Sequence, residues 1–302
     1  MEVVPVSVLQ ALEAVSADTG IALPPLLRHL VAGGATVYRP DWASTWRERC
    51  LSAPPPLISC RDFEWLDAPG VSTTAGEWLN PAYQNGQRLL PFAETGAGDA
   101  WCLVPIDGAL QPGVALVRHD SGVSEVGYRS FQDFACVQLL QALADLSDWT
   151  GEDGFSAEQA CQVVRSDVDQ VAAGMDATTG AWLRALSRAQ PLLREVRDGP
   201  RSPPRTVLSL VSQSALYEAL GRFCPPDVPA LPITARWECA PAMARSKALL
   251  AAKAPPDWRA LARKPGGKLA ALRAHQQAHG STLQQAKAAV DDFINQNPAP
   301  TP

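Results

Sequence analysis

The stretch from residue 90 to residue 134 constrains the fold more than any other part of this sequence. Two short, mostly apolar runs are typical of β-strands, and the glycine-rich residues 96–99 between them predict a tight turn. A third apolar run follows at residues 114–117. Ser130 then supplies a side-chain oxygen that can cap a helix beginning near Phe131. This order predicts antiparallel strands followed by a helix, and it places no nucleophile beside a base.

Helical patterns flank these strands. Residues 9–15 are amphipathic, and two prolines precede a second helix that begins near Leu26. Apolar residues recur at helical spacing across residues 131–146, as expected for a helix with one broad buried face. The predicted fold class is therefore α+β, a mainly antiparallel sheet with flanking helices in residues 1–147, followed by a mostly helical C-terminal region.

The order of these features resembles the SUKH superfamily of bacterial immunity proteins and cell-wall regulators. The resemblance covers roughly residues 5–146, and between residues 39 and 87 the chain departs from it through a Pro- and Trp-rich insertion. It implies a SUKH-like fold that binds another protein. The features that carry it are Gly96, Gly98 and Asp99 ahead of Trp101, the run Val114-x-Leu116-Val117-x-His119-Asp120, the helix start Ser130-Phe131-x-x-Phe134, the Leu23-Pro24-Pro25 entry and the pair Gly33-Gly34.

Charge is distributed unevenly along the chain. Residues 1–147 contain eight arginines, no lysine and sixteen acidic residues, which give a net charge of −8. The net charge is −3 for residues 148–240 and +6 for residues 241–302. An acidic body attracts basic partners and repels nucleic-acid phosphates. Solubility alone is the alternative interpretation.

Cysteine usage and hydropathy bear on the compartment. Seven scattered cysteines form no Cys-x-x-Cys motif, and no run approaches the ~18 apolar residues of a membrane helix. Glu2 and the absence of Lys or Arg before Arg28 argue against a secretory signal. These features predict reduced thiols, a cytoplasmic location and no membrane partner, with paired disulfides as the alternative.

The polar segment 147–155 predicts the boundary between residues 1–147 and residues 148–240, and residues 241–302 are predicted to form a separate basic tail. In the middle region, Ser156 begins a capping box, and we expect helix as far as residue 196.

The middle region also shows a helix break and a strand-to-helix pattern. Gly174 and Gly180 are expected to split its helical stretch into two helices. Residues 206–220 predict a strand that leads into a helix. No family resemblance is evident there.

Residues 267–294 predict a helical hairpin in the basic tail. It is similar to the helix–glycine–helix of the C-terminal domain of the bacterial ribosomal stalk protein, which implies a docking site for a second protein partner. A plain helical cap is the alternative. His275 and His279 have a spacing that can bind zinc, but no third ligand is evident, so a surface helix is preferred. The matching residues are Leu272, Arg273, Gly280, Leu283, Ala286, Lys287 and Val290.

The possible catalytic and metal-binding residues each have a simpler structural role as an alternative. His119 and Asp120 could belong to a catalytic triad, but no Gly-x-Ser-x-Gly elbow occurs, and a hairpin turn explains them more simply. Asp99 could bind a cation, yet a divalent ion needs several converging oxygens, so a cap of its own turn is preferred. The sequence therefore predicts no catalytic residue, no metal and no cofactor.

The insertion combines tryptophans with acidic residues. Tryptophans dominate the energetics of many interfaces, although filling the core is the alternative for each of them. With the family resemblance and the acidic charge, this predicts a non-enzymatic immunity protein, or antitoxin, that binds and occludes a cognate toxin, a basic nuclease-like effector. The candidate partner-binding residues are Trp42, Trp46, Glu64, Glu94, Asp99, Trp101 and Asp120.

Two other functions remain open from the sequence. One is a cytosolic regulatory adaptor or scaffold with no toxin partner, which the gene neighbourhood would distinguish from an immunity protein. The other is an enzyme in residues 148–240, a region that has no histidine and few converging polar groups.

Overall fold

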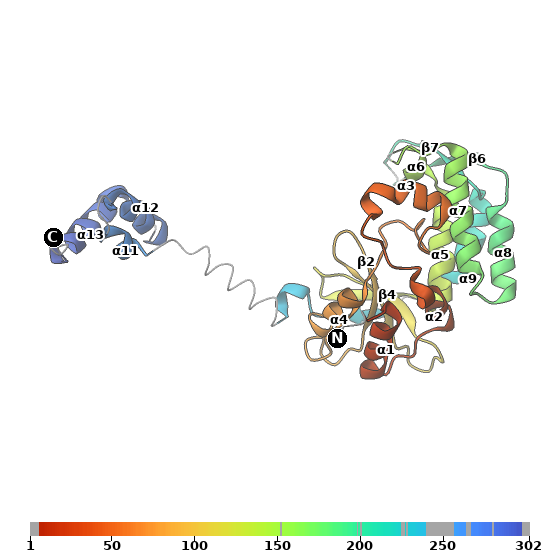
Figure 1. The fold of residues 1–302 in the computed structure, drawn as a ribbon, viewed down its shortest axis with the longest axis horizontal. Coiled ribbons are helices and arrows are strands. Elements are labelled where there is room, and N and C mark those ends of the chain that lie inside the picture. Colours follow the sequence, from red (N-terminus) through yellow and green to blue (C-terminus); the bar gives the residue numbers. More distant parts are fainter. Residues whose placement is uncertain are drawn as a thin grey trace. The chain divides into compact units, whose positions relative to one another are not determined.

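The computed structural model describes residues 6–151, 153–197, 199, 201–224, 227, 229–239, 257–263, 267–279 and 281–297. The chain divides into two compact units, Met1–Ala240 and Pro241–Pro302. In Figure 1 the first unit runs from red to cyan and the second is blue.

Within the described residues, the first unit is built on a six-stranded antiparallel sheet in the order β1-β2-β3-β4-β5-β8. The predicted α+β class and the strands at β2, β3 and β4 are confirmed, whereas β1, β5 and β8 were not predicted. β3 is buried at every position because apolar clusters cover both faces of the sheet. The bounds are β1 Glu64–Trp65, β2 Leu90–Glu94, β3 Ala100–Val104, β4 Gly113–Val117, β5 Val123–Tyr128 and β8 Ala230–Pro232.

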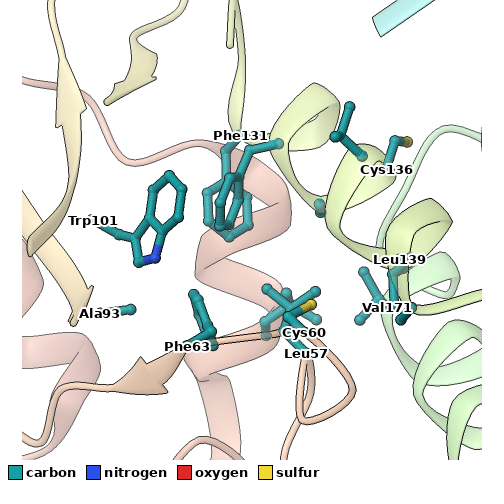
Figure 2. Close-up of a cluster of buried hydrophobic side chains, with 14 of the residues drawn as sticks. Leu57, Cys60, Phe63, Ala93, Trp101, Phe131, Cys136, Leu139 and Val171 are labelled. Carbon is teal, nitrogen blue, oxygen red and sulfur yellow. The ribbon is translucent and has the colours of Figure 1, made fainter. Parts of the chain in front are cut away.

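Helix α5 (Phe131–Ala144) provides much of the cover of one face. It begins as predicted, because the Ser130 hydroxyl accepts a hydrogen bond from the Asp133 amide at 3.1 Å. Phe134 is fully buried and lies 4.9 Å, ring centre to ring centre, from Trp101 on β3. Burying each such side chain contributes roughly 1.5–3 kcal/mol. Figure 2 shows Trp101 and the first turn of α5 within this cluster.

The alternate residues of β3 and β4 point to the other face. Cys102, Val104 and Val117 form a second, smaller apolar cluster there, together with Trp78 and with Leu231 from β8. The N-terminal half thus reaches both sides of the sheet. Its helices are α1 Val8–Thr19, α2 Pro25–Val31, α3 Trp42–Ser52 and α4 Ala68–Gly76.

A buried carboxylate joins the N-terminal half to helix α7 (Ala157–Ala172). One oxygen of Asp167 accepts from the Leu57 amide at 2.7 Å, and the other accepts from the Ser59 amide at 2.9 Å and the Ser59 hydroxyl at 2.5 Å. Burial raises the pKa of Asp167 to about 6, and the hydrogen bonds from Ser59 and Leu57 limit the rise.

Residues 148–240 do not form a separate unit at the predicted 147/148 boundary. The reason is packing: α7 and α9 lie on α5, and β8 extends the sheet at β5. The remaining elements of this region are α6 Ser147–Thr150, α8 Ala177–Ser187, β6 Leu192–Val196, β7 Arg205–Ser209, α9 Gln213–Phe223 and the 3₁₀ turn Arg236–Glu238. The strand-to-helix prediction for residues 206–220 is confirmed by β7 and α9.

Two predictions for this region were wrong. Helix does not continue to residue 196, because β6 pairs with β7 in an antiparallel hairpin. The predicted split into two helices is confirmed by α7 and α8, with Gly174 between them, but the role given to Gly180 was wrong, because it lies inside α8. A Cβ atom on Gly180 would come within 2.6 Å of the Ala172 carbonyl oxygen, so this glycine permits close packing of the two helices.

The second unit contains α11 Trp258–Ala262, α12 Lys268–His279 and α13 Leu283–Gln296. The predicted hairpin is confirmed by α12 and α13, although Gly280 lies outside the described residues. Thr282 caps α13 through a capping box with Gln285. His275 is held by a 2.9 Å hydrogen bond between its Nδ1 and the Ser281 hydroxyl, and it packs on Trp258. These contacts give His275 a role in packing this unit.

Two further findings concern the cysteines and the character of the helices. All seven cysteines are free thiols, and six of them are buried. Burial raises the pKa of Cys50 and Cys136 to about 12, which keeps these two thiols protonated and unreactive near neutral pH. Across the described part of the chain, no helix combines the length and the apolar character needed to cross a membrane.

Candidate protein-binding site

Two glutamates oppose each other where the first two strands pair. Glu64 in β1 is the register partner of Glu94 in β2, so their side chains project from the same face of the sheet. Glu64 is exposed and Glu94 is half-buried. Like charges directly opposite each other destabilise a strand pair. This arrangement therefore runs against the pairing preference of the sheet.

The turn after β2 brings a third carboxylate to the same end of the sheet. The turn closes through a 2.9 Å hydrogen bond from the Thr95 amide to the Asp99 carbonyl, and Gly98 adopts a φ of 89° within it. The Asp99 carboxylate accepts from the backbone N of His119 at 3.0 Å and contacts its ring Nδ1 at 2.6 Å. Asp99 thus joins the start of β3 to the end of β4. The prediction that its side chain caps its own turn was wrong, because Oδ1 of Asp99 binds the backbone N and the ring Nδ1 of His119.

Further carboxylates surround this point. Asp120 is exposed, and one potential ligand atom from each of Asp99, His119 and Asp120 lies within 4.8 Å of the others. Asp62 accepts a hydrogen bond from the Gly96 amide at 2.7 Å. We call Asp62, Glu64, Glu94, Asp99 and Asp120 together the acidic strand-end cluster.

The environment of Glu94 opposes its negative charge. Partial burial raises the pKa of this carboxyl, and the charges of Glu64 and Asp67 raise it further. Arg236 acts in the opposite direction and lowers it. The net effect is a raised pKa, so the native structure destabilises ionised Glu94.

Arg236 reaches this cluster from a distant part of the sequence. Its backbone N donates to the His119 carbonyl at 2.8 Å, and its guanidinium lies beside Gly98. The short strand β8 positions it by pairing with β5. The sequence held little signal for this residue, because β8 spans only Ala230–Pro232.

The chemistry available to Asp99, His119 and Asp120 is limited by their contacts. Their spacing could hold a divalent cation, but the hydrogen bonds from His119 already account for the position of Asp99. The Ser121 hydroxyl donates to the Val123 carbonyl, so it is not aligned as a nucleophile on His119. These residues therefore contribute negative charge at the surface and no catalytic alignment.

The predicted tryptophan anchors do not share one location with the carboxylates. Trp101 is buried in the core against Phe134, so its inclusion as a partner-binding residue was wrong. Trp101 lies on the face of β3 that packs under α5. Trp42 and Trp46 on α3 are half-buried; Trp42 packs edge-on against Tyr38, and Trp46 against Phe155.

Of the seven residues predicted to bind a partner, the structure brings together Glu64, Glu94, Asp99 and Asp120. Comparisons of the chain with models of protein families, with curated proteins and with solved structures found no match. The functional interpretation therefore depends on the geometry of the site itself.

Proposed function

We propose that this chain is a non-enzymatic immunity protein, whose acidic strand-end cluster binds and occludes a basic effector domain of a cognate toxin. The supporting observation is the pairing of Glu64 with Glu94 across β1 and β2. Side chains that destabilise a fold are retained where they serve binding.

The energetics favour a cationic partner. An unfavourable cross-strand pair costs roughly 0.2–1 kcal/mol, and a Lys or Arg from a partner placed between the two carboxylates would remove this repulsion. Partial burial of Glu94 strengthens such an ion pair, because the local dielectric is lower than in water. Binding would thus reduce the repulsion between the Glu64 and Glu94 carboxylates.

Occlusion requires no chemistry from this chain. A nuclease-like effector needs a cationic groove for phosphates, and a row of carboxylates presents the same charge to that groove. Acidic residues also accelerate the encounter with a basic partner, and salt weakens this effect.

Co-expression with the toxin encoded by the neighbouring gene tests this function. We expect protection of the cells and a complex that survives gel filtration. The variant Glu64→Gln/Glu94→Gln should weaken binding by tenfold or more. The matched control Asp18→Asn/Glu218→Gln, which neutralises two exposed acids outside the cluster, should bind as the wild type does. Unprotected cells together with the absence of any complex would refute the proposal.

A further inference from the structure

A cavity on the first unit has a character opposite to that of the acidic strand-end cluster. Its volume is about 420 Å³, and its walls come from the turn after α2, from α3 and from α7. Volumes of about 300–1,000 Å³ are typical of small-molecule sites. Arg39 and Arg49 line it together with Trp42, and no Asp or Glu is among its lining residues. This is unexpected in residues 1–240, whose net charges of −8 and −3 sum to −11.

Two hydrogen bonds hold Arg49 in place and leave other N–H donors of its guanidinium unused. Its Nε donates to the Thr45 hydroxyl at 2.8 Å, and one terminal nitrogen donates to the Asp41 carboxylate at 2.8 Å. A guanidinium has five N–H donors, so these two bonds fix its orientation without exhausting it. Asp41 is not among the residues that line the cavity.

Arg39 supplies a second positive charge. Its side chain is exposed and forms no ion pair within 4.0 Å among the described residues, although its charge also acts on the Asp41 carboxylate. Planar guanidinium forks match the geometry of carboxylate and phosphate oxygens. Asp41 offsets part of the charge of the two guanidiniums, and together the three side chains leave the cavity with a net positive charge that favours an anion.

The remaining walls allow a close approach and provide a flat apolar surface. Gly33 and Gly34 have φ values of 77° and 75°, and no heavy atom lies within 4 Å of a Cβ placed on either of them. The open space beside both backbones leaves room for a ligand. Trp42 offers its indole to an apolar or ring-shaped group.

The geometry points to a binding site for a small organic anion, one with a carboxylate or phosphate group held by Arg39 and Arg49 and a flat apolar part against Trp42. This site is independent of the toxin-binding proposal, because none of the acidic strand-end cluster lines it. Ser166 and Gln170 on α7 also line the cavity and add neutral hydrogen-bonding groups.

Calorimetric titration of the full chain tests the inference with two charged probes and their uncharged analogues. The probes are adenosine 5′-monophosphate with adenosine, and indole-3-acetate with indole-3-acetamide. We expect at least one anion to bind with a Kd below about 1 mM, and tenfold or more tightly than its uncharged analogue. Which anion binds distinguishes a phosphate site from a carboxylate site.

Variants assign the binding to the cavity. Arg39→Gln and Arg49→Gln should each weaken the anion by about tenfold, whereas Arg129→Gln, an exposed arginine elsewhere on the unit, should leave it unchanged. Circular dichroism checks the fold of each variant, and if Arg49→Gln fails to fold, the exposed Arg39 decides. The inference is overturned if neither anion binds, if charged and uncharged probes bind equally, or if the folded Arg39 variant binds as the wild type does.

Discussion

At the scale of single residues, two carboxylates with raised pKa values differ in what they contribute. Asp167 is fully buried and accepts three hydrogen bonds that anchor the loop containing Leu57 and Ser59. Glu94 is half-buried and faces another glutamate. The first carboxylate therefore holds the structure together, and the second is available to a partner.

Replacing Asp167 should destabilise the fold. In Asp167→Ala, the amides of Leu57 and Ser59 lose their acceptor, and each buried unsatisfied donor costs about 1–3 kcal/mol. We expect the free energy of unfolding in urea to fall by about 2–5 kcal/mol. Asp169→Asn, an exposed position on the same helix, should change it by less than about 1 kcal/mol. Equal effects at the two positions would argue against the anchoring role.

Asp167 also predicts a dependence of stability on pH. Its folded pKa of about 6 lies above its ordinary value of 3.8, so the folded state binds the proton more tightly. Its contribution to stability is fully present below pH 3.8 and is lost as pH rises through about 6. The stability of the wild type relative to Asp167→Asn should therefore fall between pH 4 and pH 6. A constant difference over that range, measured by urea unfolding, would contradict this assignment.

At the scale of elements, the patterns that depend on neighbouring residues were predictable and those that depend on distant partners were not. Strands β2, β3 and β4 and the capped start of α5 follow from local apolar runs and from Ser130. The local sequence of β6 predicts the end of a helix, and the segment is a strand because it pairs with β7. β1 and β8 are too short to carry a pattern and exist through pairing with β2 and β5.

Packing between β4 and β5 depends on a glycine. A Cβ on Gly113 would lie 2.7 Å from the Tyr128 carbonyl oxygen and 2.6 Å from Ile106. Because a backbone atom cannot move aside cheaply, we expect Gly113→Ala to lower the free energy of unfolding by about 1–3 kcal/mol. Gly127 in β5 has no heavy atom within 4 Å of a Cβ, so Gly127→Ala is the matched control and should have little effect. Equal losses in thermal unfolding would show that steric contact is not the cause.

At the scale of the whole molecule, the candidate site was predictable in its charge but not in its composition. Glu94, Asp99 and Asp120 could be chosen because they lie in or beside the predicted strands β2, β3 and β4, and Glu64 because it belongs to the acidic, Trp-rich insertion. Trp101 does not belong to the site because it lies on the face of β3 that packs under α5. Arg236 lies beside the site because β8 pairs with β5. These are properties of the assembled sheet.

The division into two compact units predicts independent folding. We expect a truncated chain of residues 1–240 to unfold cooperatively, with a melting temperature within a few degrees of the corresponding transition in the full chain. Circular dichroism and calorimetry measure this. A truncated chain that no longer folds would show that the tail contributes to the stability of the first unit.

In the proposed function, the acidic strand-end cluster serves binding at the expense of stability. The direct measurement compares wild type with Glu94→Gln in two assays, the free energy of unfolding at pH 7 and the affinity for the co-purified toxin at low and high salt. We expect the variant to be more stable by about 0.2–1 kcal/mol, to bind the toxin more weakly, and to show a smaller dependence of affinity on salt. A variant that is less stable than the wild type and binds with unchanged affinity and salt dependence would contradict the account.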